Sequence, residues 1–183
     1  MVARVSPTGL DPVKAREIIS HWFSARHTAA IAFKEDLNPR FDPDARYEVA
    51  YEATFEPMTL DQARVEVWIT TDGNASIGFE RRKRIAERLG IRNCNDRFAA
   101  GHEPNPVIAS GLVAVLDMIA DGQVAIAPTV IPILGLISTR AVMVREAVES
   151  LVSRGYPSVS WLQVTSTSAL SSNKNLVRFH KWT

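Results

Sequence analysis

Alternating apolar and polar residues run through positions 44–80, which read DARYEVAYEATFEPMTLDQARVEVWITTDGNASIGFE. A period of two is typical of a strand with one face packed on a core and the other face in water. The second break in the pattern holds Asp72-Gly73, whose glycine supplies the positive backbone angle of a tight hairpin. We therefore predict an antiparallel three-stranded meander with strands at Arg46–Glu56, Arg64–Thr71 and Asn74–Glu80.

The alternation also assigns each residue of the meander to a face. The predicted core face is apolar and consists of Tyr47, Val49, Tyr51, Ala53, Phe55, Val65, Val67, Ile69, Ala75, Ile77 and Phe79. The face expected in water is acidic, and our candidate binding residues on it are Glu48, Glu52, Glu66 and Trp68. Aromatic side chains are favoured anchors at interfaces, although a covering loop or simple exposure would also account for one tryptophan there.

Helices are expected before and after the meander. Asp11-Pro12 joins a capping side chain to a proline at the first helical position, so one helix begins there. Further helices are predicted at Glu80–Leu89, Asn105–Ala120 and Arg140–Arg154, and strands at Ser158–Thr165 and Asn175–Lys181. Period alone leaves two questions open: whether Ala29–Phe33 is helix or strand, and whether the last two strands complete the meander sheet or form a ribbon.

These elements predict a single α+β domain over residues 1–183, in which an antiparallel sheet packs against four or so helices. The composition, 46% hydrophobic and 22% charged, is ordinary for one globular domain. The longest apolar stretch, Val124–Ile137, is interrupted by prolines and is shorter than the roughly 20 residues that a membrane helix needs. No secretory leader pattern follows Met1, so we expect a soluble, cytoplasmic protein.

Charge is unevenly distributed although the formal net charge is only +1. Residues 34–72 hold ten acidic and four basic side chains, whereas residues 81–97 hold seven basic and two acidic ones. A basic stripe at helical spacing is formed by Arg81, Arg84 and Arg88. Because no aromatic residues lie between these arginines, nucleic acid is not the expected partner, and the stripe is interpreted as a solvated face or an intramolecular partner of the acidic strands.

The region between Arg97 and Arg140 contains neither lysine nor arginine. So long a stretch without basic residues either fills the core or forms a subunit contact. A homodimer is the commonest closed assembly, and we expect self-association through this region.

Catalytic chemistry has one weak signal. Cys94, His102 and Glu103 supply a thiol, an imidazole and a carboxylate, the parts of a cysteine nucleophile. Their spacing does not place the sulfur against the imidazole, and a lone cysteine is usually a small buried apolar residue. No histidine pair has zinc spacing and no glycine-rich phosphate loop occurs, so we expect no metal and no cofactor.

The sequence thus favours a macromolecule-binding module that uses its acidic sheet face on a protein partner, as an inhibitor or an immunity protein does. The alternative is a small enzyme or ligand-binding domain with a pocket near Cys94 and His102. Whether the protein is an enzyme is left open by the residues themselves.

Overall fold

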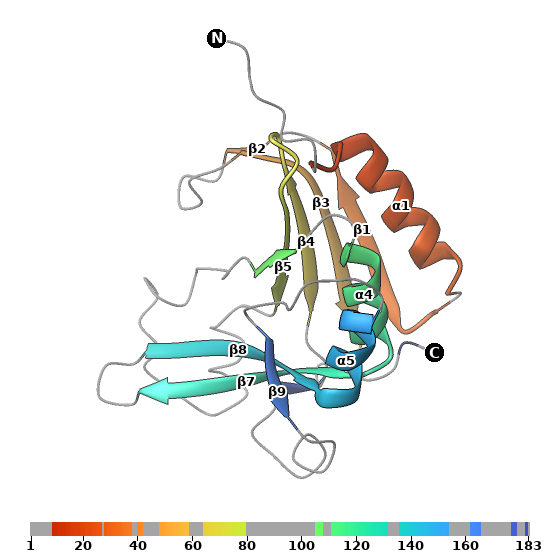
Figure 1. The fold of residues 1–183 in the computed structure, drawn as a ribbon. Coiled ribbons are helices and arrows are strands. Elements are labelled where there is room, and N and C mark those ends of the chain that lie inside the picture. Colours follow the sequence, from red (N-terminus) through yellow and green to blue (C-terminus); the bar gives the residue numbers. More distant parts are fainter. Residues whose placement is uncertain are drawn as a thin grey trace.

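The computed structural model describes residues 9–26, 28–37, 40–41, 48–58, 64–79, 105–107, 111–131, 136–153, 162–165, 177–178 and 182. Within these ranges three helices and ten strands make an α+β fold (Figure 1). The elements are α1 Pro12–Ser24, β1 Ile31–Asp36, β2 Arg40–Phe41, β3 Glu48–Pro57, β4 Val65–Thr70, β5 Ala75–Phe79, β6 Asn105–Val107, α4 Leu112–Ala120, β7 Val124–Ile131, β8 Leu136–Val144, α5 Arg145–Ser153, β9 Leu162–Thr165 and β10 Val177–Arg178.

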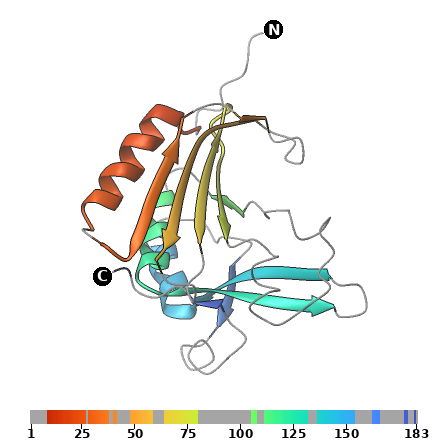
Figure 2. The ribbon, with the colours of Figure 1, turned by 180° about the vertical axis from the view of Figure 1, so that it is seen from behind.

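The strands form two sheets. The first is antiparallel, with the order β1-β3-β4-β5-β6 and with β2 also paired to β3. The second has the order β10-β7-β8-β9, in which β8 and β9 are parallel. The long hairpin of β7 and β8 runs crosswise to the strands of the first sheet, as both views show (Figures 1 and 2).

The predicted meander is confirmed as β3, β4 and β5. Its second turn needs glycine for two reasons: Gly73 has φ of 83°, and a Cβ there would lie 2.9 Å from the Cα of Gly9. This close approach allows the Leu10 N–H to donate to the Gly73 carbonyl at 2.9 Å. The segment before α1 is thereby attached to the hairpin.

Helix α1 begins where Asp11-Pro12 predicts. The Asp11 carboxylate accepts hydrogen bonds from the backbone N–H groups of Val13 and Lys14, both at 3.0 Å. These bonds satisfy two of the donors that a helix start leaves without partners. The sequence left open whether Ala29–Phe33 is helix or strand. In the structure, strand β1 begins at Ile31 and pairs with β3.

The core lies between α1, α4 and one face of the first sheet. Phe55 of β3 has no exposed surface, and its ring centroid lies 5.8 Å from Trp22, 5.6 Å from Phe23, 5.3 Å from Phe33 and 5.3 Å from Trp182. These rings come from α1, β1 and the far end of the chain. Around them pack apolar residues of the meander and of α4, including Ile19, Ile69, Ile77, Leu116 and Ile119.

Two helix predictions are wrong at their N-terminal ends. Asn105-Pro106 begins no helix: it lies in β6, which pairs with β5, and α4 starts only after Gly111. The residue before a proline favours extended backbone, and an edge strand tolerates the missing N–H. Residues 140–144 are likewise strand, because β8 pairs with β7 up to Met143, and α5 starts at Arg145.

The remaining predictions for the second half of the chain are confirmed in part. Strand is described within both predicted late strands, as β9 and β10; β9 pairs with β8 and β10 pairs with β7, and neither joins the meander. The helix expected at Glu80–Leu89 lies outside the described residues. Within the described ranges three helices are observed, so the prediction of four or so helices is not confirmed. None of the described helices has the length and apolarity needed to cross a membrane.

Val67→Asp is expected to unfold the protein. The Val67 side chain has no exposed surface and lies on the core face of β4, so the new carboxylate would be buried without a partner. The cost, several kcal/mol, is comparable with a total stability of about 5–15 kcal/mol. The control Thr71→Asp adds the same charge at an exposed position just beyond β4. Thermal unfolding followed by circular dichroism measures both; a wild-type melting temperature for Val67→Asp would contradict the assignment of the core face.

Candidate functional site

The face of the first sheet that points away from α1, which we call the outer face, carries the candidate binding residues. Strand register defines its rows. Asp36 of β1 lies opposite Glu52 of β3, which lies opposite Trp68 of β4. The neighbouring row places Thr54 of β3 opposite Glu66 of β4.

Exposure changes across this face from β1 to β4. Lys34 on β1 is exposed, and Asp36, Glu52 and Glu56 are half-buried. In contrast, Glu66 is 2% exposed and Trp68 is 9% exposed. The expectation that Glu66 and Trp68 lie on a face open to water is therefore wrong, and β4 is buried on both of its faces.

Trp68 is buried partly because its ring lies across the neighbouring strand at Gly78. A Cβ added to Gly78 would overlap carbon atoms of the Trp68 ring. Glycine inside a strand often marks a place where another group approaches the backbone closely. Gly78 is thus the sequence signal that could have placed Trp68 in the packed layer rather than in solvent.

The carboxylate of Glu66 is buried, and it is paired with a residue that directly precedes the same strand. The Arg64 guanidinium donates a hydrogen bond to the Glu66 carboxylate. Arg64 retains 20% of its side-chain exposure, whereas Glu66 retains 3%. A buried carboxylate is tolerated when it is paired in this way, so Glu66 is interpreted as part of the folded interior.

A bulge in β3 separates Glu48 from the other carboxylates. The pairing with β4 shifts between Val49, opposite Thr70, and Tyr51, opposite Ile69, so that β3 has one extra residue at Ala50. Val49 therefore lies on the outer face, contrary to strict alternation, and is absent from the core cluster although it is buried.

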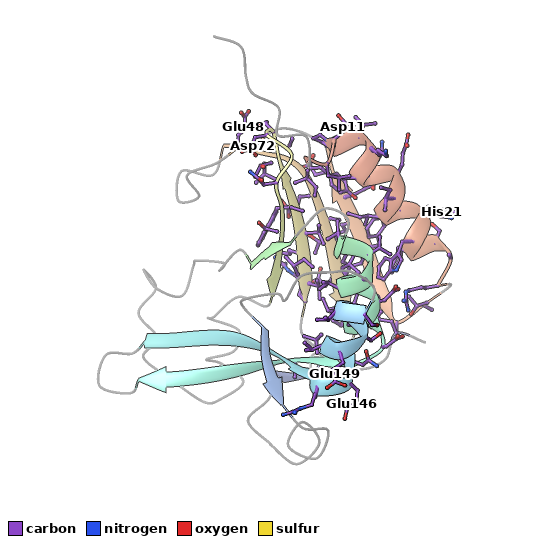
Figure 3. The ribbon with its side chains drawn as sticks, viewed as in Figure 1. Asp11, His21, Glu48, Asp72, Glu146 and Glu149 are labelled. Carbon is purple, nitrogen blue, oxygen red and sulfur yellow. The ribbon has the colours of Figure 1, made fainter. Side chains whose placement is uncertain are left out.

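The same shift in register places Glu48 on the opposite side of β3 from Glu52. Figure 3 shows Glu48 beside Asp72 at one end of the sheet.

The accessible part of the outer face is an acidic strip, which we define as Asp36, Glu52 and Glu56. Lys34 is its basic neighbour, with its ammonium 3.1 Å from the Glu56 carboxylate. Asp36 and Glu52 are direct cross-strand partners, an arrangement of like charges that disfavours the sheet. Of the predicted binding residues, only Glu52 belongs to this strip; Asp36 and Glu56 are additions from the structure.

The core face holds a second polar cluster, centred on Glu35, that the sequence did not reveal. Arg16 Nε and Ser20 Oγ of α1 each donate to Glu35 at 2.8 Å, and the buried Tyr51 hydroxyl lies 3.5 Å away. Burial acts to raise the pKa of Glu35, but the hydrogen bonds from Arg16 and Ser20 outweigh it and hold this pKa below its ordinary value. Burial raises the pKa of Tyr51, so this residue stays a neutral donor. The cluster attaches α1 to β1 and β3.

The other candidates cannot be placed. Cys94, His102 and Glu103, and the basic stripe of Arg81, Arg84 and Arg88, all lie outside the described residues. Within the part of the chain that the structure describes, no three His, Cys, Asp or Glu side chains are arranged to hold a metal ion.

Comparisons with protein-family models, with curated proteins and with solved structures find no match to this chain. Its function therefore has to be argued from its own residues.

Gly78→Ala is expected to destabilise the fold by about 1–3 kcal/mol, because the new methyl group forces the Trp68 ring out of its place. A double-mutant cycle with Trp68→Ala isolates this contact. Gly78→Ala should cost much less when the ring has already been removed. Urea unfolding of the four proteins gives the coupling; equal costs in both backgrounds would contradict the packing of Trp68 over Gly78.

Glu35→Gln is expected to reduce the loss of stability at acid pH. Because the folded pKa of Glu35 lies below its ordinary value of 4.5, ionised Glu35 stabilises the fold above that pH. This contribution disappears as pH falls through the folded pKa. Asp72, whose pKa is lowered chiefly by a hydrogen bond from Thr70, contributes in the same direction in both proteins, so their difference isolates Glu35.

The control for that comparison is Glu17→Gln, which removes an exposed carboxylate from α1, the helix that the Glu35 cluster attaches to β1 and β3. Urea unfolding from pH 7 to pH 3 is the measurement. A Glu35→Gln protein whose stability falls with acid as steeply as that of the wild type would show that the Glu35 cluster does not hold α1 in place.

Proposed function

We propose that this protein is a macromolecule-binding module whose acidic strip receives a basic surface of a protein partner. The observation that carries the proposal is the direct opposition of Asp36 and Glu52 on accessible strands of the outer face. A cation of a partner placed near both carboxylates would add a favourable interaction. With Glu56, these residues give this part of the outer face an excess of negative charge, which favours a basic partner.

The rigidity of the neighbouring strand supports the same reading. Glu66 and Trp68 of β4 are buried beside the strip, and Glu66 is paired with Arg64. Strands β1 and β3 therefore present their carboxylates from a sheet whose next strand is packed on both faces. A preorganised charged surface loses little freedom on binding, which favours affinity.

The chemistry of the strip indicates a basic protein rather than a nucleic acid. Asp36, Glu52 and Glu56 outnumber Lys34, and carboxylates repel phosphates but attract lysine and arginine. Asp36, Glu52 and Glu56 each take part in further interactions of their own. The proposal accordingly rests on the local excess of negative charge and not on any unpaired group.

Neutralising the like-charged pair tests the proposal. Asp36→Asn with Glu52→Gln keeps the shapes of both side chains and removes both charges. We expect capture of basic proteins from a lysate of the native host to fall at least tenfold, equivalent to about 1.4 kcal/mol. Captured proteins are quantified by mass spectrometry at low and high salt, because binding through charges weakens as salt rises.

The matched control removes two charges elsewhere. Glu146 and Glu149 are exposed on α5 (Figure 3), which is not part of the first sheet, and Glu146→Gln with Glu149→Gln changes the net charge equally. This control should retain the partners. Equal capture by the wild type and the Asp36 and Glu52 variant, or equal loss in both double variants, would contradict the proposed surface.

An inhibitor- or immunity-like role, a homodimer and a cytoplasmic location are finer parts of the same proposal. For the homodimer, seven residues of α4 are already buried in the chain's own core, so part of the region without basic residues is used in folding. The alternative of a small enzyme rests on Cys94 and His102, and no observation on the described residues favours it.

A further inference from the structure

Trp182, near the end of the chain, is held at two points in the core of the first sheet. Its side chain packs in a cage of aromatic rings, with centroids 6.0 Å from Trp22, 6.5 Å from Phe23 and 5.3 Å from Phe55. Its backbone N–H donates to the Ala120 carbonyl at 2.8 Å. Trp182 retains 4% of its exposure.

The bond to Ala120 completes the C-terminal end of α4. Gly122, with φ of 71°, and Gln123 donate to the carbonyls of Ile119 and Met118, at 3.0 and 2.9 Å, and Asp121 donates to that of Asp117. The last four carbonyls of a helix have no partner within it, and here only that of Ala120 is left by this turn. Trp182 supplies its donor.

The same stretch of chain also belongs to the second sheet. Val177 and Arg178, a few residues before Trp182, form β10 and pair with Ile126 and Ala125 of β7. Strand β7 itself starts at Val124, directly after the turn that ends α4. The chain therefore passes from the second sheet into the core of the first at the point where α4 becomes β7.

Trp182 is one of the described side chains that connect the second half of the chain to this core. Among the residues whose burial is described, those beyond α4 in the core are Val124, the partly buried Val148 and Trp182. Trp182 is the largest of the three. The pairs of Val177 with Ile126 and of Arg178 with Ala125 join the segment before Trp182 to β7.

We infer that Trp182 is a latch that fixes the second sheet to the aromatic cage of the first, so that its release uncouples the two sheets without unfolding the first. The cage of Trp22, Phe23 and Phe55 accepts an indole ring, because these side chains surround one in the folded chain. The core of the first sheet also contains Ile19, Ile69 and Leu116, from α1, β4 and α4, so it has apolar packing besides the aromatic cage when the latch opens.

Hydrogen exchange of Trp182→Ala tests the latch. We expect protection of the β7 and β10 amides to fall at least tenfold, while the amides of β3, β4 and β5 change by less than about threefold. Free indole at millimolar concentration can fill the emptied apolar cage but should not restore protection in β7, because it is not joined through the chain to β10. Trp182→Phe, which keeps a ring in the cage, should stay close to the wild type.

Ile19→Ala is the matched control, since it creates a cavity in the core of the first sheet without touching the chain end. It should reduce protection in β3, β4 and β5. If Trp182→Ala loses hydrogen-exchange protection equally in both sheets, or unfolds completely, Trp182 is an ordinary core residue and not a latch. Unchanged protection of β7, or its recovery with free indole, would also overturn the assignment of the ring as the latch.

Discussion

The packing of Phe55 against rings from three other parts of the chain is the contact on which the rest of the structure depends. Trp22 and Phe23 bring α1 to it, Phe33 brings β1, and Trp182 brings the end of the chain. Aromatic pairs with centroids 4.5–7 Å apart contribute about 0.5–1.5 kcal/mol each beyond the area they bury. Because one side chain collects four such contacts, it determines which face of the first sheet is the core and which is left for other uses.

The face that remains is divided by a second layer of packing. Trp68 closes over Gly78, and Glu66 is buried with Arg64, so β4 has no face in water. The accessible carboxylates are confined to β1 and β3, at one side of the outer face. An acidic surface on a rigid support therefore follows from the distribution of large side chains on β4 and of charges on its neighbours.

The sequence predicted the local features and not the long-range ones. Alternation found β3, β4 and β5, and Asp11-Pro12 found α1, because each signal lies within a few residues. The bulge at Ala50 reversed the faces of Val49 and Glu48, and no periodicity reports an inserted residue. The apolar run of β7 has no period that separates strand from helix. Strand β8 was missed, and its last residues, Arg140–Val144, were predicted as helix, because its pairing with β7 is a tertiary contact. The burial of Trp68 depends on Gly78, ten residues away.

The measurement that tests the proposed binding surface most directly is a nuclear magnetic resonance titration of the labelled protein with a short lysine-rich peptide. The account predicts that the amide shifts cluster on β1 and β3 around Asp36, Glu52 and Glu56, and that they shrink as salt is added. Amides of α5, beside the exposed Glu146 and Glu149, should move little. Shifts that are strongest on α5, or spread evenly over all exposed carboxylates, would contradict the acidic strip as the site where a basic partner binds.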